Sequence, residues 1–322
     1  MKKALHIIIL LTAMSISACT KINISTEQPG TQYPYIFFDA EVLQTKAMLN
    51  SQTLPYEAGT DFGVFGYKGD SESNTPVFVY ENQGVKAERM YRKKDNGSFL
   101  YDNLVLWTED TYDFYAYYPY IPGTQIGMHE HNGAYVTYTQ PESLTAMVDF
   151  MTASNTGVEY SKNGSLVNFE FEHRLFAFDV EIKNGSTSSQ AITISSAKIT
   201  LHNVASGAVL YYTEDIETIG DPIDITAEFP SETESIEAGS HLILNREDSF
   251  LLLPTSSLTV SFNITGTDGF GDFDISVDTQ TITSDFEAGQ RYKMVISKLD
   301  GEGFMATVSG WEDGGDITFK FN

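Results

Sequence analysis

The sequence predicts an all-β protein with two antiparallel β-sandwich domains in tandem. First, many segments alternate apolar and polar residues with a period of two, which places the apolar side chains on one face of a strand. Second, no stretch of ten or more residues after the N-terminal segment has convincing helical periodicity. Third, aromatic residues make up 13% of the chain, with 18 Tyr and 21 Phe, and aromatic side chains suit half-buried strands.

The N-terminal segment, residues 1–18, predicts a lipoprotein signal peptide. Lys2 and Lys3 precede a short apolar run, and small residues follow it up to Cys19. The run is shorter than the roughly 18 apolar residues that span a bilayer. The residues before Cys19 fit a lipobox, so we expect cleavage there and attachment of the chain to a membrane by acyl chains on Cys19. An ordinary signal peptide with a chance cysteine is the alternative.

The charge balance excludes one class of partner. The chain has 44 Asp and Glu against 19 Lys and Arg, a formal net charge of −25. Such a surface repels phosphate backbones, so we expect no nucleic-acid partner. The basic cluster Arg89–Lys94 departs from this balance and is expected to be a solvated hairpin loop, with a partner-docking patch as the alternative. The single cysteine excludes a disulfide framework.

The predicted order along the chain is a signal, a tether and two domains. Residues 19–48 hold the tether and the first strand, residues 49–163 the N-terminal sandwich, and residues 164–322 the C-terminal sandwich. The boundary follows from the polar run Ser161–Ser165. Residues 214–240 are rich in polar side chains and are expected to be a long loop.

Individual strands follow from the alternation in each domain. In the N-terminal domain the expected strands lie at residues 64–67, 77–80 and 112–118, the last ending at Pro119. In the C-terminal domain they lie at residues 167–171, 176–182, 258–264, 273–277, 292–296 and 317–319. Asn184-Gly185 and Asp268-Gly269 supply tight turns.

Catalytic signatures are absent from the sequence. It contains no Gly-x-Ser-x-Gly elbow and no His-Glu-x-x-His motif, and its one cysteine is assigned to lipid. We therefore expect no enzyme activity and no cofactor. His173 lies between two strongly alternating segments and is expected to be buried and hydrogen-bonded.

Two groups of residues offer metal ligands, but neither matches a known site. His129 and His131 place two imidazoles on one face of a possible strand without a recognisable third ligand. Asp268, Asp272 and Asp274 offer hard oxygen ligands, yet their spacing differs from a calcium loop and Asp-Gly favours a hairpin turn. We expect no metal site.

A series of aromatic-rich segments recurs in a characteristic order. The series comprises Phe62–Tyr67, Trp107, Tyr112–Tyr120, Asp149–Ala153, Val167–Leu175, Phe286–Tyr292 and Trp311. In order and spacing this series resembles the fimbrillin family, whose members build type V pili on certain Gram-negative anaerobes. The resemblance covers nearly the whole chain and rests on core and turn residues, so it concerns the fold more than an activity.

The resemblance implies two transthyretin-like β-sandwich domains made as a lipoprotein precursor. In polymerising members a protease cuts after a basic residue, commonly Arg, and removes the first strand, and a strand from a neighbouring subunit fills the groove. Here residues 35–43 would form the first strand, and Lys46-Ala47 stands at the cleavage position with Lys in place of Arg. The C-terminal residues 317–322 would be a donated strand or, as slightly favoured, the last strand of their own sheet.

The resemblance also implies a function. We expect a cell-surface lipoprotein of the fimbrium, a structural, anchor or tip subunit of a type V pilus that acts in adhesion. Its partners would be other pilus subunits, joined by strand exchange, and a host or bacterial surface ligand. The alternative is a carbohydrate-binding outer-membrane lipoprotein of a glycan-uptake system, in which Trp107 or Trp311 stacks on sugars. If the first strand is retained, the lipid on Cys19 is the working anchor.

Overall fold

The computed structural model describes residues 34–42, 61–69, 75–80, 84–92, 99–160, 166–229, 235–244, 249–300, 303–310 and 317–319. Strands make up nearly all regular structure in these ranges, so the all-β prediction is confirmed. The exception described in full is a 3-10 turn, η1 (Leu144–Ala146). In the described ranges, no helix has the length and apolar character that crossing a membrane requires. Cys19, Lys46, Ala47 and Trp311 lie outside the described residues.

The N-terminal lobe contains two sheets. The strands of its eight-stranded sheet, in spatial order, are β1 (Phe37–Val42), β12 (Leu166–His173), β11 (Met151–Val158), β8 (Tyr112–Tyr118), β2 (Phe62–Lys68), β6 (Glu88–Arg92) and β7 (Phe99–Leu100), with β3 (Thr75–Pro76) paired to β2. Its four-stranded sheet contains β16 (Ile216–Ile219), β15 (Gly207–Tyr211), β10 (Gly133–Thr139) and β9 (Ile126–His129). A separate hairpin pairs β4 (Val79–Tyr80) with β5 (Gly84–Val85).

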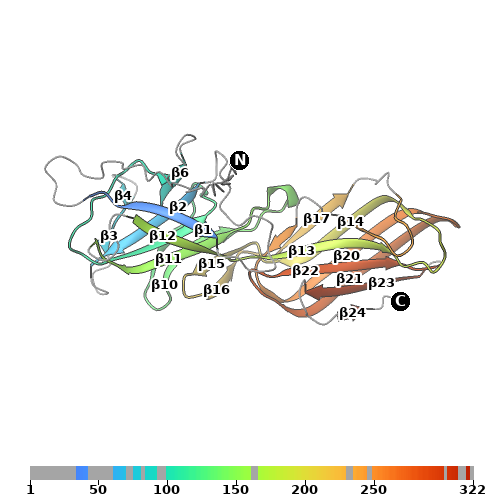
Figure 1. The fold of residues 1–322 in the computed structure, drawn as a ribbon. Coiled ribbons are helices and arrows are strands. Elements are labelled where there is room, and N and C mark those ends of the chain that lie inside the picture. The colour runs from blue at the N-terminus through green and yellow to red at the C-terminus, as the bar shows by residue number, and fades with distance from the viewer. Residues whose placement is uncertain are drawn as a thin grey trace, which may run out of the picture.

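The C-terminal lobe also contains two sheets and lies end to end with the first lobe (Figure 1). Its six-stranded sheet contains β18 (His241–Ile243), β13 (Phe176–Asn184), β22 (Arg291–Lys298), β23 (Phe304–Gly310) and β24 (Ile317–Phe319), with β19 (Phe250–Leu252) paired to β13. Its four-stranded sheet contains β17 (Ile223–Phe229), β14 (Thr193–Val204), β20 (Thr255–Asp268) and β21 (Gly271–Phe286).

The eight-stranded sheet curls, so that β1 contacts β7 at the opposite end of its strand order. The concave side encloses one hydrophobic cluster, which includes Phe62, Phe114 and Phe169. The convex side contributes Phe65 and Tyr117 to a second cluster, shared with the four-stranded sheet and continuous with the core of the C-terminal lobe. This sheet is therefore covered on both faces.

The strands β2 and β8 differ from the expected pattern of one buried and one solvated face. Phe62 and Val64 of β2 face the concave cluster, whereas Phe65 and Tyr67 face the other. A Cβ added to Gly66 would lie 2.6 Å from the Phe114 ring, so glycine permits the close approach of β2 to β8. A covered sheet accepts apolar residues on both faces, which is why this stretch of β2 reads as a continuous apolar run.

Two polar regions predicted as loops contain strands. Residues 214–240, expected as a long loop, contain β16 and β17, which pair with β15 and β14. Ile225 is buried there with Ala227, and the polar residues of β17 face solvent. Arg89 and Arg92 of the basic cluster, expected in a solvated hairpin loop, belong to β6, with Arg89 exposed, whereas Lys93 and Lys94 lie outside the described residues. These predictions were wrong because a strand with few buried side chains carries a weak alternation signal.

Strands on both sides of residue 163 share sheets. β12 pairs with β1 and β11, and β15 pairs with β10, although β12 and β15 follow residue 163 in the sequence. The division of the chain at residues 163 and 164 stays a prediction.

Candidate functional site

The strand β1 lies at the edge of the eight-stranded sheet and is the candidate functional element. It runs parallel to β12, in register from Phe37 opposite Leu166 to Val42 opposite Phe171. Just before β1, Ile36 N–H donates to the carbonyl oxygen of Val105 at 2.8 Å. Trp107 N–H donates to the carbonyl oxygen of Pro34 at 3.0 Å. The start of this segment is therefore held on both sides, by β12 and by residues 105–107.

The side chains of this segment alternate between the core and solvent. Ile36 and Phe38 are buried in the concave cluster, and Ala40 packs against it. Asp39 and Glu41 are exposed. This alternation is that of a strand with one apolar face inserted into a groove.

Phe38 lies at the centre of an aromatic cluster. Its ring centre is 5.2 Å from that of Phe114, 5.7 Å from that of Tyr101 and 5.8 Å from that of Phe169. The Tyr101 and Phe114 rings meet it edge to face, whereas the Phe169 ring is stacked. Burial of a phenylalanine side chain contributes about 1.5–3 kcal/mol, and each aromatic pair adds about 0.5–1.5 kcal/mol. Phe38 therefore contributes much of the affinity of β1 for its groove.

Tyr101 adds a polar contact to the same segment. Its hydroxyl donates to the carbonyl oxygen of Ile36 at 2.7 Å and accepts from Val105 N–H at 3.2 Å. Burial raises the pKa of the Tyr101 hydroxyl above its ordinary value of 10.0, so the group stays protonated and remains a donor. The groove thus offers a fixed donor to the backbone of the strand that occupies it.

Trp107 belongs to the core rather than to the surface. It is fully buried, and its ring centre is 5.2 Å from that of Tyr112 and 6.1 Å from that of Tyr160. The alternative in which Trp107 stacks on sugars is therefore excluded, because no face of its indole is open to a ligand.

The candidate metal ligands have structural roles. His129 Nδ1 accepts hydrogen bonds from the backbone N–H groups of His131 and Asn132, which closes the turn between β9 and β10. Asp268 accepts from the N–H groups of Phe270 and Gly271 in the hairpin turn between β20 and β21. Among the described residues, no group of three or more His, Cys, Asp or Glu side chains is placed to hold a metal ion.

His173 is buried, as predicted, at the end of β12. Its Nδ1 lies 2.5 Å from Asp149 Oδ2, and the two side chains are 5% and 12% exposed. The pair lies where the chain passes from β12 into β13 of the C-terminal lobe. It is a structural contact between segments that are far apart in sequence.

The C-terminal strand β24 pairs antiparallel with β23, from Ala306 opposite Phe319 to Val308 opposite Ile317. It is therefore the last strand of its own six-stranded sheet in this structure, as slightly favoured from the sequence. Whether this strand is also donated to a neighbouring subunit stays a prediction.

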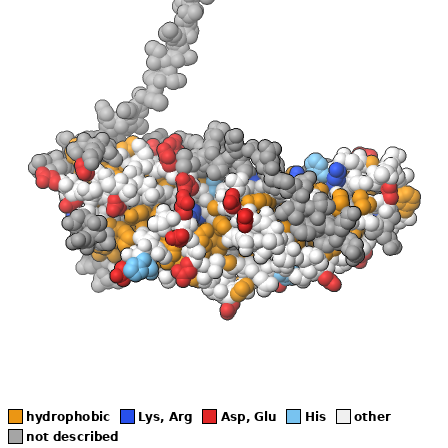
Figure 2. All heavy atoms as spheres, turned by 90° about the horizontal axis from the view of Figure 1, so that it is seen from below, with side chains coloured by type: hydrophobic (Ala, Val, Ile, Leu, Met, Phe, Trp, Pro, Cys, Tyr) orange, Lys and Arg blue, Asp and Glu red, His pale blue; other side chains and the backbone are white. Residues whose placement is uncertain are grey.

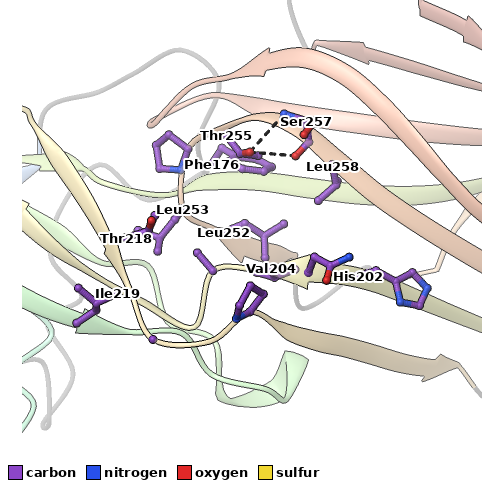
Figure 3. A pocket seen from close by; sticks show the side chains of 15 residues that line it. Phe176, His202, Val204, Thr218, Ile219, Leu252, Leu253, Thr255, Ser257 and Leu258 are labelled. Carbon is purple, nitrogen blue, oxygen red and sulfur yellow. Dashed lines mark hydrogen bonds between the residues drawn. The ribbon is translucent and has the colours of Figure 1, made fainter.

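The described cavities do not resemble a catalytic cleft. One of about 240 Å³ lies under the turn between β16 and β17, and Figure 3 shows Val204, Leu252 and Leu253 around it. The hydroxyl of Thr255 at its rim bonds the backbone of Ser257. A more open cleft of about 890 Å³ is lined by residues that include Glu172, Glu214 and Glu287. Figure 2 shows Asp and Glu side chains scattered over one face with few Lys or Arg, in line with the net charge.

The first strand was predictable from the sequence, whereas the residues that line its groove were not. The expected strand at 35–43 overlaps β1 at Phe37–Val42. Tyr101 and Val105 come from a loop without alternation, and Phe78 from an expected strand of which β4 covers only Val79–Tyr80. The signal that could have identified these three residues is that each is apolar or aromatic.

The sequence matches the fimbrillin-like family over residues 45–311. No sequence among the curated proteins is similar enough to this chain to count as a match. A fimbrial protein from Bacteroides vulgatus has a similar fold, with a TM-score of 0.60 at 16% identity, covering 89% of this chain and 99% of that one. A candidate cell adhesion protein from Bacteroides ovatus has a TM-score of 0.51 at 15% identity, covering 91% and 100%. Another from Parabacteroides distasonis has a TM-score of 0.50 at 9% identity, covering 86% and 96%.

Proposed function

The chain belongs to the fimbrillin-like family of fimbrial and cell-adhesion proteins, and we propose that it is a fimbrial subunit whose strand β1 is exchanged for a strand of a neighbouring subunit. The way β1 is seated carries this proposal. At the edge of its sheet, the segment at 34–42 inserts its apolar face, with Phe38, into a cluster of aromatic rings and leaves its polar face outside.

Removal of β1 would leave a surface that requires a replacement. The groove would expose the rings of Phe114, Phe169 and Tyr101, and the edge of β12 would lose its backbone partners. Exposed apolar surface and unpaired strand edges are both unfavourable in water. A strand from another molecule satisfies both by β-augmentation, with backbone hydrogen bonds for affinity and alternate side chains for specificity.

Cleavage at Lys46 is the step that we propose makes β1 replaceable. Residues 43–60 join β1 to the segment that leads into β2, so a cut there leaves β1 held by non-covalent contacts alone. A protease that accepts Lys would release it and produce a polymerising stalk subunit. If Lys46 is not cut, β1 is retained and the protein is an anchor or tip subunit. In that case the lipid on Cys19 attaches it to the outer membrane.

Expression in a fimbriated host tests the proposal. Fimbriae are sheared from cells that express the wild type or Lys46→Ala, and the subunit is sized by gel filtration and mapped by peptide mass spectrometry. We expect wild-type polymer that lacks residues 19–46, whereas Lys46→Ala remains on the cell with these residues intact. Lys198→Ala, an exposed lysine of β14, is the matched control and should polymerise normally.

Two outcomes separate the subunit types. Wild-type monomer that retains residues 19–46, together with fimbriae that assemble on it, assigns an anchor. Wild-type polymer that still contains residues 19–46 contradicts exchange of β1. The carbohydrate-binding alternative has no support from Trp107, because that side chain is buried.

A further inference from the structure

Three side chains on the four-stranded sheet of the C-terminal lobe form a continuous hydrogen-bonded chain. His202 Nε2 lies 2.8 Å from Ser261 Oγ, and His202 Nδ1 lies 2.9 Å from Asp224 Oδ2. The residues come from the adjacent strands β20, β14 and β17. A hydroxyl, an imidazole and a carboxylate in this order are the groups that activate a serine nucleophile.

Two irregularities in strand pairing lie at His202 and at Ser261. The pairing of β14 with β17 shifts register between Leu201 and Val204, and that of β20 with β21 shifts between Val260 and Phe262. β-bulges of this kind re-aim side chains and are frequent beside active sites. Within the first bulge Asn203 has φ of 56°, an uncommon value for a residue other than glycine.

The bulge places a second donor on the carboxylate. Asn203 N–H donates to Asp224 Oδ1 at 3.0 Å, while His202 contacts Oδ2. The hydrogen bonds from His202 and from Asn203 lower the pKa of Asp224 from its ordinary value of 3.8. An ionised carboxylate only accepts hydrogen bonds, so His202 carries its proton on Nδ1. In the neutral imidazole, Nε2 is then the acceptor for the hydroxyl of Ser261.

We propose that Ser261 is a nucleophile that small activated esters acylate, with His202 as its general base and Asp224 as the group that orients His202. The Ser261 oxygen forms a bond to the acyl carbon, and its proton passes to His202 Nε2. The ester C–O bond breaks, and the leaving alkoxide takes that proton. Water then hydrolyses the acyl-serine to the free acid and restores the hydroxyl.

The surroundings of Ser261 predict slow chemistry rather than rapid turnover. Ser261 lies in β20 between β14 and β21, at the point where the pairing of β20 with β21 shifts register. One oxyanion-hole donor contributes about 10²–10³ in kcat, and most backbone N–H groups of a sheet are already used in pairing between its strands. We therefore expect a stoichiometric burst followed by slow release.

The site is open to solvent. The side chains of His202 and Asp224 are 22% and 56% exposed. Figure 3 shows His202 at the edge of the cavity of about 240 Å³, with its imidazole directed away from Leu252 and Leu253. The acyl group would therefore meet Ser261 on the open sheet face and not within the cavity. The site shares no residue with the groove of β1, so its test is independent of the proposed fimbrial function.

Acetylation by p-nitrophenyl acetate tests the proposal on the full chain. Release of p-nitrophenolate is followed by absorbance, and peptide mass spectrometry locates the acetyl group. We expect a burst of one equivalent with acetyl on Ser261, which Ser261→Ala abolishes. His202→Gln should acylate about 10²-fold more slowly or worse, because general-base catalysis contributes about 10²–10⁴. Asp224→Asn should also slow the burst.

Ser196 provides the matched control on the same pair of strands. Its Oγ lies 2.8 Å from the hydroxyl of Thr265, and no histidine among the described residues bonds it. We expect no acetyl on Ser196 and an unchanged burst in Ser196→Ala. Thermal unfolding of each variant checks that it folds. If His202→Gln does not fold, the burst rate of Asp224→Asn tests the role of the relay instead. Acetylation of Ser261 no faster than that of Ser196, or an undiminished rate in both relay variants, overturns the proposal.

Discussion

The hydroxyl of Tyr101 donates a hydrogen bond of 2.7 Å to the backbone carbonyl of Ile36, which lies 65 positions earlier in the sequence. The same hydroxyl accepts a hydrogen bond from the N–H of Val105. The carbonyl oxygen of Val105 in turn accepts one from the N–H of Ile36. One buried side chain thus joins the segment that leads into β1 to the loop beside it. Substitution of Tyr101 should therefore weaken the binding of β1 to the rest of the lobe.

Replacing Tyr101 with Phe should loosen β1 without changing the shape of the groove. The substitution removes the buried hydrogen bond to the Ile36 carbonyl and the one from Val105 N–H, and the loss of a buried partner costs about 1–3 kcal/mol. We expect a lower urea midpoint. After cleavage at Lys46, the fragment that contains β1 should dissociate faster. The control is Tyr91→Phe, which removes an exposed hydrogen bond to Asp102. Equal midpoints for the two variants would contradict the role of Tyr101.

Phe38→Ala should destabilise the N-terminal lobe far more than Phe37→Ala. Phe38 is buried among aromatic rings, whereas its neighbour Phe37 is half-buried and points away from them. A large-to-small change in a core costs about 3–5 kcal/mol for phenylalanine. Chemical unfolding of the intact chain measures both variants. Similar losses from the two would show that β1 does not depend on one inserted face.

Asp149→Ala should cost more stability than the loss of an exposed ion pair. Asp149 contacts His173 in a largely buried site, and leaving a buried hydrogen-bonding group without its partner costs about 1–3 kcal/mol. Lys198→Ala removes an ion pair with Glu228 in which the two side chains are 55% and 72% exposed. Exposed ion pairs contribute about 0–1 kcal/mol. Urea unfolding of both variants provides the comparison. A loss for Asp149→Ala as small as that for Lys198→Ala would rule out a structural role for the buried contact.

Asp300 should make stability depend on pH in the acid range. Hydrogen bonds from the hydroxyls of Ser186 and Thr187 and from Thr187 N–H lower the pKa of Asp300 from 3.8 to about 2. Because the unfolded chain takes up the proton first, the stabilisation is present above pH 3.8 and is lost as the pH falls through about 2. We expect the Tm difference between the wild type and Asp300→Asn to shrink over this range.

The exposed residue Asp221 supplies the control for that titration. Asp221→Asn should follow the wild-type Tm at every pH. A Tm difference for Asp300→Asn that stays constant down to about pH 2 would contradict the hydrogen-bonded state of the Asp300 carboxylate.

Strands with a strong local alternation were predicted closely. The strand at 112–118 coincides with β8, and the predicted segment 176–182 lies within β13. β17 was missed because only Ile225 and Ala227 of its seven residues are buried, so its composition resembles that of a loop. The groove around Phe38 was missed for a different reason, because its walls come from β8, β12 and a loop that share no sequence pattern.

Local alternation in the sequence was enough to predict strands with a strongly apolar face, such as β8, but not β17, and the ordered aromatic motifs carried the resemblance to fimbrillins. The tertiary structure decided that β1 lies parallel to β12 beneath Tyr101, and that His202 meets Ser261 and Asp224. The physical reason is the range of each interaction. Alternation reflects the two faces of one extended chain and is visible locally. Strand pairing and the meeting of distant side chains depend on backbone hydrogen bonds and burial between segments that are far apart in sequence.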